Sequence, residues 1–366
     1  MPSALEPARS SRRTFLAIGA ALGVGIGAIG LAGCGPAGGS SPKGAAETPG
    51  GTGTATKPPA ADQTQSPSFP GAAEAAVRHE KLAAYATTVL TVGRKNKDLD
   101  AAGRKLVTAI RDQQLAQAAA LRTPDPTDPS ASSPATTTTP SPSDSAPATA
   151  KQPTFAQAVA QLEAAATRAA ANHRRNALTA DQLSALLWGS LATSAAATTA
   201  VLEAADLAGA HPEPAAAAVG AVRSRAPMPV VTIVAAEQEV VQQLHALVYG
   251  YQLALGRLKG ARQDAAAAEL RQHRILRDRL TTRLLNRKAD VPVAKAAYVP
   301  STNPRNAATA AKLIRQMETG FQPFCGLWLA AAPTSIERTE ALNQLGHATT
   351  VARQWGAALP AWPGWS

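Results

Sequence analysis

The sequence predicts an all-α protein, in which a C-terminal four-helix bundle with one long crossover follows a second alanine-rich helical unit. Aromatic residues make up only 4% of the 366 residues, while alanine is abundant. Several long segments repeat apolar residues at the spacing of an α-helix. Glycine and proline cluster between these segments, where they interrupt regular structure. This composition favours closely packed helices over sheets, which are rich in aromatic and β-branched residues.

The first 33 residues are predicted to be an export signal. Arg12 and Arg13 precede a threonine, a phenylalanine and a leucine, as in a twin-arginine signal. The run 16–33 carries no charge but is rich in glycine and alanine. A stable spanning helix prefers about 20 strongly apolar residues, and glycine disfavours helix. A transmembrane anchor is therefore only the alternative interpretation of this run.

Residues 31–34, with the sequence LAGC, resemble the lipobox of bacterial lipoproteins. The resemblance implies cleavage before Cys34 and attachment of a diacylglyceryl group to its thiol. Lipid, and not a protein span, would then hold the chain at the extracytoplasmic face of the cell membrane. The second cysteine, Cys325, would be left without a disulfide partner, and its apolar neighbours predict a buried, inert thiol.

Two low-complexity segments and the charge complete the layout. Residues 34–71 predict a disordered tether, and residues 123–153 predict a disordered insertion, which is either a plain linker or glycosylated. The formal net charge is +11. The arginines are scattered along helices without interleaved aromatics, and an exported lipoprotein rarely meets nucleic acid, so no nucleic-acid partner is expected. These arginines are interpreted as solvated faces drawn toward anionic lipid headgroups.

Residues 72–208 are predicted to form a helical unit interrupted by the 123–153 insertion. Two helices precede the insertion, with a break near residues 95–100, and two follow it. Thr154-x-x-Gln157 and Thr179-x-x-Gln182 both fit the capping-box pattern and predict helix starts. The last helix is expected from residue 181 to about residue 208, followed by a proline-rich connector over 209–229.

Residues 230–366 are predicted to contain four more helices. The first ends at a tight turn at residues 259–260, and the second spans about 262–288. The third is expected to open with Asn303 as its cap and Pro304 in its first turn. Thr334-x-x-Glu337 is the predicted cap of the fourth.

The connection between the second and third of these helices decides their topology. Its fifteen residues, ADVPVAKAAYVPSTN, can extend to about 45 Å. A helix of about 27 residues is about 40 Å long, so this connection can traverse the whole bundle. Two hairpins joined by one long crossover form the ferritin-like arrangement.

The C-terminal part also resembles a ferritin-like domain family of unknown function that is found in actinobacterial proteins. Five stretches carry the resemblance, in the order AEQEVVQQLHALVYGYQLALGRL, ELRQHRILRDRL, AAYVPSTNP, LIRQMETGFQPFCGLWLAAA and ARQWGAALPAWPGW. The resemblance covers residues 230–366 and implies a fold, but no activity. Trp362 and Trp365 near its end are expected to fold back over the bundle; the alternative is a hook for a partner.

A carboxylate–histidine cluster is geometrically possible in the middle of the C-terminal bundle. Di-metal ferritin-like proteins use Glu-x-x-His motifs, which these four helices lack. Residue counts from the turns place four candidates at similar height, namely Glu269, His273, His245 and Glu318. Three interpretations stay open: a metal site, a buried polar network that fixes helix register, or exposed side chains. His347 is expected to face outward.

The predicted function is a non-catalytic binding or scaffold role in the cell envelope, without a cofactor and with envelope proteins as partners. One alternative is a metal-dependent oxidoreductase or metal-storage protein that uses the four candidates. Another is a carrier with an apolar pocket between bundle helices. The sequence does not fix the oligomeric state.

Overall fold

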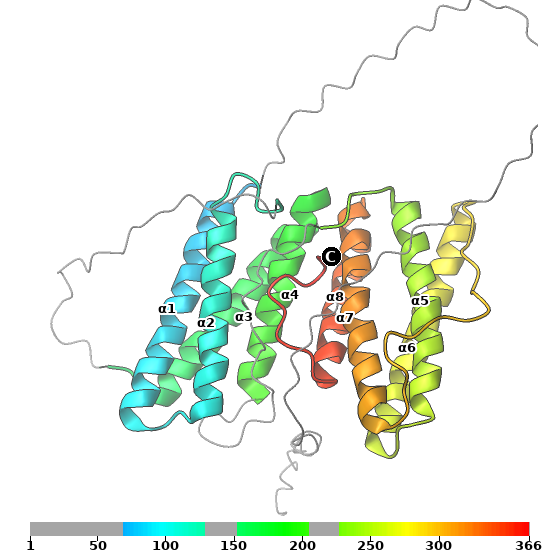
Figure 1. Cartoon of the computed structure of the whole chain (residues 1–366). Helices are drawn as coiled ribbons and strands as arrows, with labels where there is room; N and C mark the ends of the chain where they lie inside the picture. The colour runs from blue at the N-terminus through cyan, green and yellow to red at the C-terminus, as the bar shows by residue number, and fades with distance from the viewer. Residues whose placement is uncertain (1–68, 129–151, 205–226, 366) are drawn as a thin grey trace, which may run out of the picture. The chain divides into compact units, whose positions relative to one another are not determined.

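The computed structural model describes residues 69–128, 152–204 and 227–365, and all their regular secondary structure is helical (Figure 1). The predicted all-α fold is therefore confirmed. The described helices belong to one compact unit that spans Pro67–Ser366. Arg12, Arg13 and Cys34 lie outside the described residues, as do most of the tether and most of the two predicted linkers.

The first four helices form two hairpins. α1 (Ala72–Asn96) pairs with α2 (Ala101–Leu121), and α3 (Phe155–Thr179) pairs with α4 (Gln182–Ala204). α1 also packs on α3 and so joins the hairpins. The break predicted near residues 95–100 is confirmed, and the Asp100 side chain caps α2 by accepting a hydrogen bond from the Gly103 amide at 2.6 Å.

One of the two predicted capping boxes in this half is present. Thr154 accepts from the Gln157 amide, and the Gln157 side chain accepts from the Thr154 amide, so α3 begins as predicted. The prediction of a second capping box at Thr179-x-x-Gln182 is wrong. Thr179 is the last residue of α3, and its hydroxyl donates backward to the carbonyls of Arg175 and Asn176. Gln182 has a left-handed backbone with φ of 46°, which is not the geometry of the third residue of a helix.

The last four helices repeat this connectivity. α5 (Ile233–Leu255) pairs with α6 (Ala261–Asn286), α7 (Ala307–Ala331) pairs with α8 (Ser335–Gln354), and α5 packs on α7. The predicted turn before α6 is confirmed, with Gly260 at φ of 57°. Residues 287–306 make the crossover between the two hairpins.

The start of α7 corrects a prediction, while the start of α8 confirms one. Asn306, and not Asn303, caps α7, because Asn306 and Thr309 bond each other's backbone amides reciprocally. Residues 303–306 are still part of the crossover. Thr334 caps α8 by accepting from the Glu337 amide, as predicted.

The two halves meet where α4 packs on α7 and α8, and where α3 contacts α8. Gly189 of α4 permits this close approach, because a Cβ atom at that position would lie 2.3 Å from Cδ2 of Leu329. Buried Arg338 joins the hairpin turns by donating to the carbonyls of Leu178 and Ala332 and to the carboxylate of Asp181. The halves therefore share one core.

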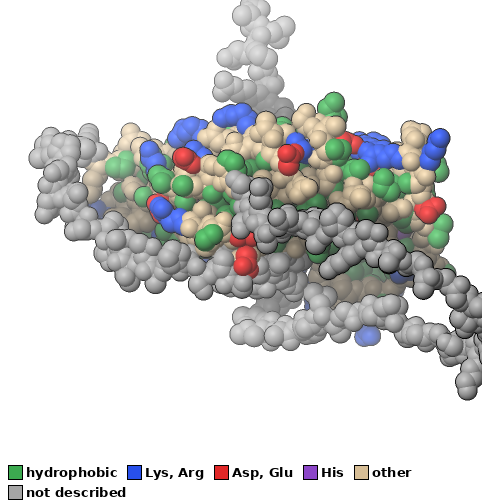
Figure 2. Space-filling model, turned by 90° about the horizontal axis from the view of Figure 1, so that it is seen from above, with side chains coloured by type: hydrophobic (Ala, Val, Ile, Leu, Met, Phe, Trp, Pro, Cys, Tyr) green, Lys and Arg blue, Asp and Glu red, His purple; other side chains and the backbone are tan. Residues whose placement is uncertain are grey.

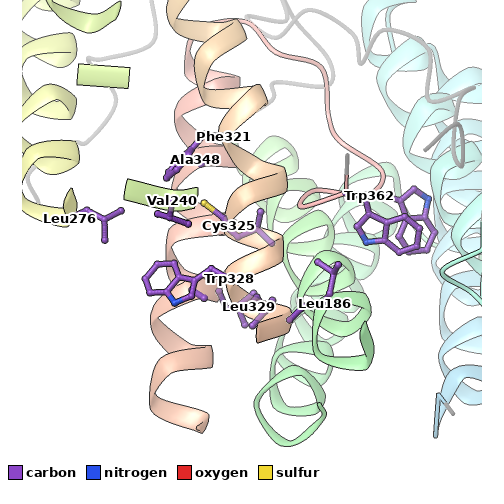
Figure 3. Close-up of a cluster of buried hydrophobic side chains, with 14 of the residues drawn as sticks. Leu186, Val240, Leu276, Phe321, Cys325, Trp328, Leu329, Ala348 and Trp362 are labelled. Carbon is purple, nitrogen blue, oxygen red and sulfur yellow. The ribbon is translucent and has the colours of Figure 1, made fainter. Parts of the chain in front are cut away.

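Apolar side chains from both halves fill this core (Figure 3). Leu186 of α4 lies near Leu329 of α7, and Cys325, one turn before Leu329 in α7, is fully buried. α4 is long and apolar enough to cross a membrane, but 83% of its most apolar window is buried inside the protein. Burial of this kind is typical of a core helix.

The C-terminal tail, residues 355–365, crosses from the second half to the first. Gln113 and Gln117 of α2 donate to the carbonyls of Pro360 and Ala361 at 2.8 and 2.7 Å, and Ser194 of α4 donates to Pro360 at 3.1 Å. The two tail tryptophans are buried, with their ring centroids 4.7 Å apart. The prediction that Trp362 and Trp365 fold back is confirmed.

A glycine pair allows the end of the tail to lie against α7. A Cβ atom on Gly326 would stand 2.1 Å from the carbonyl oxygen of Gly364. Gly364 itself has φ of 91°, which favours glycine. The tail is thus built into the protein interior and is not a loose end.

Candidate functional site

The structure brings together two of the four candidate residues. His273 Nε2 lies 2.7 Å from Oε1 of Glu318, and both side chains are buried, at 1% and 0% exposure. Glu269 bonds His347 instead, and His245 turns toward the crossover, where its Nε2 lies 3.2 Å from the carbonyl oxygen of Pro292. The four therefore do not converge on one point, and of the three interpretations the buried network describes His273 and Glu318.

Tyr251 of α5 is the third member of this network, and its position among the buried apolar residues of α5 would by itself indicate only a core residue. Its hydroxyl donates to the same Oε1 atom of Glu318 at 2.6 Å. An ionised carboxylate only accepts hydrogen bonds, so His273 Nε2–H is the second donor. Three helices, α5, α6 and α7, are thereby tied through one oxygen atom near the middle of the bundle.

The surroundings of this network are apolar. The ring of Phe321 meets His273 edge-on at 6.0 Å, and the ring of Tyr251 lies 5.2 Å from His273. Burial, and then the charge of Glu318, raise the pKa of the Tyr251 hydroxyl well above its usual range. The same two causes raise the pKa of the Cys325 thiol, so this cysteine stays protonated and inert, as predicted.

Two polar atoms of the network lack a hydrogen-bond partner. Oε2 of Glu318 and Nδ1 of His273 are both buried and unsatisfied. A buried unsatisfied polar atom lowers the free energy of unfolding by about 1–3 kcal/mol, so both atoms destabilise the folded protein.

Glu269 and His347 form a second pair near the surface, where Oε2 lies 2.8 Å from Nε2. This hydrogen bond is the main cause that raises the pKa of His347. His347 faces outward only in part: its side chain is 39% exposed and is held across α6 and α8 by Glu269. A helical wheel of α8 alone could not show that its partner comes from another helix.

An arginine–carboxylate ladder joins α5, α6 and α8 at the other end of the bundle. Arg283 donates to Glu237 at 3.1 Å and to Glu340 at 2.5 Å. Arg287 reaches both Glu237 and Glu337. Glu237 has no exposed surface, and desolvation raises its pKa in spite of these two arginines. These ion pairs hold α5, α6 and α8 in register and leave no open binding site between them.

The first half contains a buried histidine stack that the sequence analysis missed. His79 of α1 donates from Nδ1 to Oε1 of Gln114 at 2.7 Å, because the amide oxygen can only accept. The ring of His173 stacks on His79 at 5.1 Å and on Trp188 at 5.6 Å. Both histidines follow alanines at helical spacing, which is the signal that predicts their burial.

Burial keeps both histidines of the stack neutral at pH 7. Desolvation, which outweighs the bond to Gln114, lowers the pKa of His79 from 6.5 to about 4. Desolvation, followed by the neighbouring His79 and Arg78, lowers the pKa of His173 well below its usual value.

Acid is therefore expected to weaken the first half. Between pH 6.5 and about 4, unfolded His79 binds a proton that the folded state refuses, so the free energy of unfolding falls as pH falls. The loss is about 1.4 kcal/mol per pH unit and reaches about 3 kcal/mol near pH 4. Urea unfolding from pH 7.5 to pH 4 measures it. His79→Gln should show a flatter pH dependence than the wild type; an equal slope would contradict this account.

Two further features bear on binding. Among the described residues, no three His, Cys, Asp or Glu side chains come together in a way that could hold a metal ion. A pocket of about 160 Å³ lies between α5, α7 and the crossover, lined in part by Tyr249, Tyr298 and Met317. Pockets for organic ligands usually measure about 300–1,000 Å³, so this one suits only a very small apolar molecule.

Charged side chains do not gather into one basic surface on the visible face of the molecule (Figure 2). Lys and Arg side chains stand there among acidic, apolar and other side chains.

The family model that matches this chain lies in its C-terminal half. The family model described as "Domain of unknown function (DUF4439)" matches residues 236–366. No curated protein matches. Among solved structures, a conserved hypothetical protein from Mycobacterium tuberculosis is 28% identical over 34% of this chain and 93% of that chain, with a TM-score of 0.33. The predicted likeness to a family of unknown function is thus confirmed for α5–α8 and the tail, and residues 236–366 are similar to a domain to which no activity is attached.

Proposed function

We propose that this is a lipid-anchored protein of the cell envelope, whose C-terminal domain is ferritin-like and has a non-catalytic binding or scaffold role. The anchor is Cys34, after export directed by Arg12 and Arg13. The ferritin-like proposal is supported by the two hairpins of α5–α8 and the crossover over 287–306 that joins them. Envelope proteins are the proposed partners.

The observation that carries the scaffold role is the bonding of Glu318. In di-metal proteins of this architecture, inward carboxylates and histidines hold the ions. Here both hydrogen bonds to Oε1 of Glu318 come from protein side chains, Tyr251 and His273. A network of this kind fixes the register of three helices, which suits a rigid support more than a reaction centre.

A divergent metal-binding oxidoreductase or metal-storage protein is the second candidate. It is favoured by one observation: Oε2 of Glu318 and Nδ1 of His273 are buried without a partner. An ion could satisfy such atoms, although only two ligands would come from this network.

Replacement of Cys34 tests the anchor. Wild-type protein should enter the membrane fraction and incorporate a fatty-acid label, because acyl chains supply the membrane affinity. Cys34→Ala should lose the label and appear in the soluble fraction. Cys325→Ala is the matched control, since Cys325 is fully buried and should not change either result. Retention of Cys34→Ala in the membrane fraction would contradict the lipid-anchor proposal.

A further inference from the structure

Each half of the protein leaves a cleft between the second helices of its two hairpins. In the first half these are α2 and α4, and in the second half they are α6 and α8; the first helices, α1 with α3 and α5 with α7, pack on each other directly. α6 and α8 are joined instead by side chains that reach across, such as Arg279 to Glu340 at 2.7 Å and His347 to Glu269 at 2.8 Å.

In the first half, a non-helical piece of chain lies at this place, where Gln113 and Gln117 of α2 also donate across to Ser194 of α4 at 2.5 and 3.0 Å. Gln113, Gln117 and Ser194 donate to the backbone carbonyls of Pro360 and Ala361. These hydrogen bonds bind the tail through its main chain. The tail sequence in this region, LPAWPGW, is uncharged and contains two prolines. Residues 357–360 of the tail have no regular secondary structure, which leaves the Pro360 carbonyl free for such donors. The chain then turns over residues 361–364, where the Trp365 amide donates to the Trp362 carbonyl at 3.3 Å.

The corresponding cleft of the second half is an open groove of about 380 Å³. It lies at the same level along its helices. Counted from the first residue of each helix, His347 in α8 has the position of Ser194 in α4, and Gln272 in α6 is within one residue of the position of Gln113 in α2. The lining residues are Gln272, Ile275, Leu276, Arg279, Glu340, Asn343, Gln344 and His347.

The chemistry of the lining suits a peptide backbone. Gln272 and Gln344 carry amides, which both donate and accept hydrogen bonds. The amide oxygen of Asn343 already accepts from Arg174 at 3.0 Å, which leaves its NH₂ group as a donor. Ile275 is 58% exposed beside buried Leu276, and so provides an apolar wall for one side chain of an occupant. Arg279 pairs with Glu340, which Arg283 also bonds, so the charged side chains that line the groove already have partners within the protein.

We propose that the α6–α8 groove binds a non-helical, uncharged, proline-containing segment of a partner protein, in the way that the α2–α4 cleft binds the tail. This proposal rests on the binding role proposed above and names the surface that performs it. Backbone carbonyls of the partner would accept from the groove amides, and one apolar side chain would lie on Ile275.

The test uses a fluorescent peptide with the sequence of residues 357–365, because the equivalent cleft holds this sequence. It is titrated into the full chain and followed by anisotropy. Saturable binding is expected to weaken at least about tenfold in Ile275→Asp, the loss of one good contact in a small interface. Leu285→Asp is the matched control, since Leu285 is also exposed, at 61%, but lies outside the groove. Circular dichroism checks that both variants keep their helices.

Three outcomes would overturn the proposal. The first is no saturable binding to the wild type. The second is binding that Ile275→Asp leaves unchanged but Gln113→Ala alters, which would place the peptide in the α2–α4 cleft. The third is a wild-type dimer that excess peptide dissociates, which would make the tail of a second copy the occupant. Membrane fractionation of Cys34→Ala is independent of all three, so failure of the groove is distinguishable from failure of the anchored scaffold.

Discussion

Deletion of residues 359–366 is expected to lower the free energy of unfolding by at least about 5 kcal/mol. The deletion removes three large side chains that are almost fully buried: Leu359 at 3%, Trp362 at 9% and Trp365 at 8% exposure. Truncating one buried tryptophan to alanine alone costs about 3–5 kcal/mol. The deletion also leaves the amides of Gln113 and Gln117 without the carbonyls that they bond.

Urea unfolding followed by circular dichroism measures this effect. Val299→Ala is the control, because Val299 is 98% exposed and its loss should change stability by less than about 0.5 kcal/mol. Gly326→Val tests the same packing from the other side, since any Cβ there meets the Gly364 carbonyl oxygen. Wild-type stability in the deletion variant would show that the tail does not hold the two halves together.

His273→Ala is expected to cost about 3–5 kcal/mol, because it leaves the carboxylate of Glu318 in the core with Tyr251 as its remaining bonded partner. The size of the effect depends on burial, and both side chains are at most 1% exposed. Urea unfolding at pH 7 gives the free energy for the variant and the wild type.

A double variant separates a structural network from simple loss of packing. His273→Leu with Glu318→Met removes both polar groups and should be more stable than His273→Leu alone, since no unpaired buried charge is left. If the two substitutions instead cost the sum of their separate effects, Glu318 and His273 do not act as a unit.

Local patterns predicted the helices well. They failed where the same four-residue pattern occurs both at the start and at the end of a helix. Thr154-x-x-Gln157 opens α3, yet the same spacing at Thr179 lies at the end of that helix. Both contain a threonine and a glutamine three residues on, and the difference lies in the backbone at Gln182, with φ of 46°. Such a turn depends on the packing of α4 and cannot be read from the four residues alone.

The site was harder to predict because its contacts cross between helices. Counting from the turns placed His273 and Glu318 at one height correctly. It could not show that His245 rotates toward the crossover, or that His347 and not His245 takes the second carboxylate. Tyr251 was missed because a tyrosine in an apolar stripe looks like core, and only the placement of Glu318 gives its hydroxyl a role.

Metal analysis of the natively exported protein tests the central claim, that Glu318 is held by the side chains of Tyr251 and His273 and not by a metal ion. The account predicts only traces of iron, manganese and zinc in the wild type, and the same traces in Glu318→Gln, which keeps the shape of the side chain. One metal ion per chain in the wild type, lost in Glu318→Gln, would contradict it and make the protein a divergent metal carboxylate protein.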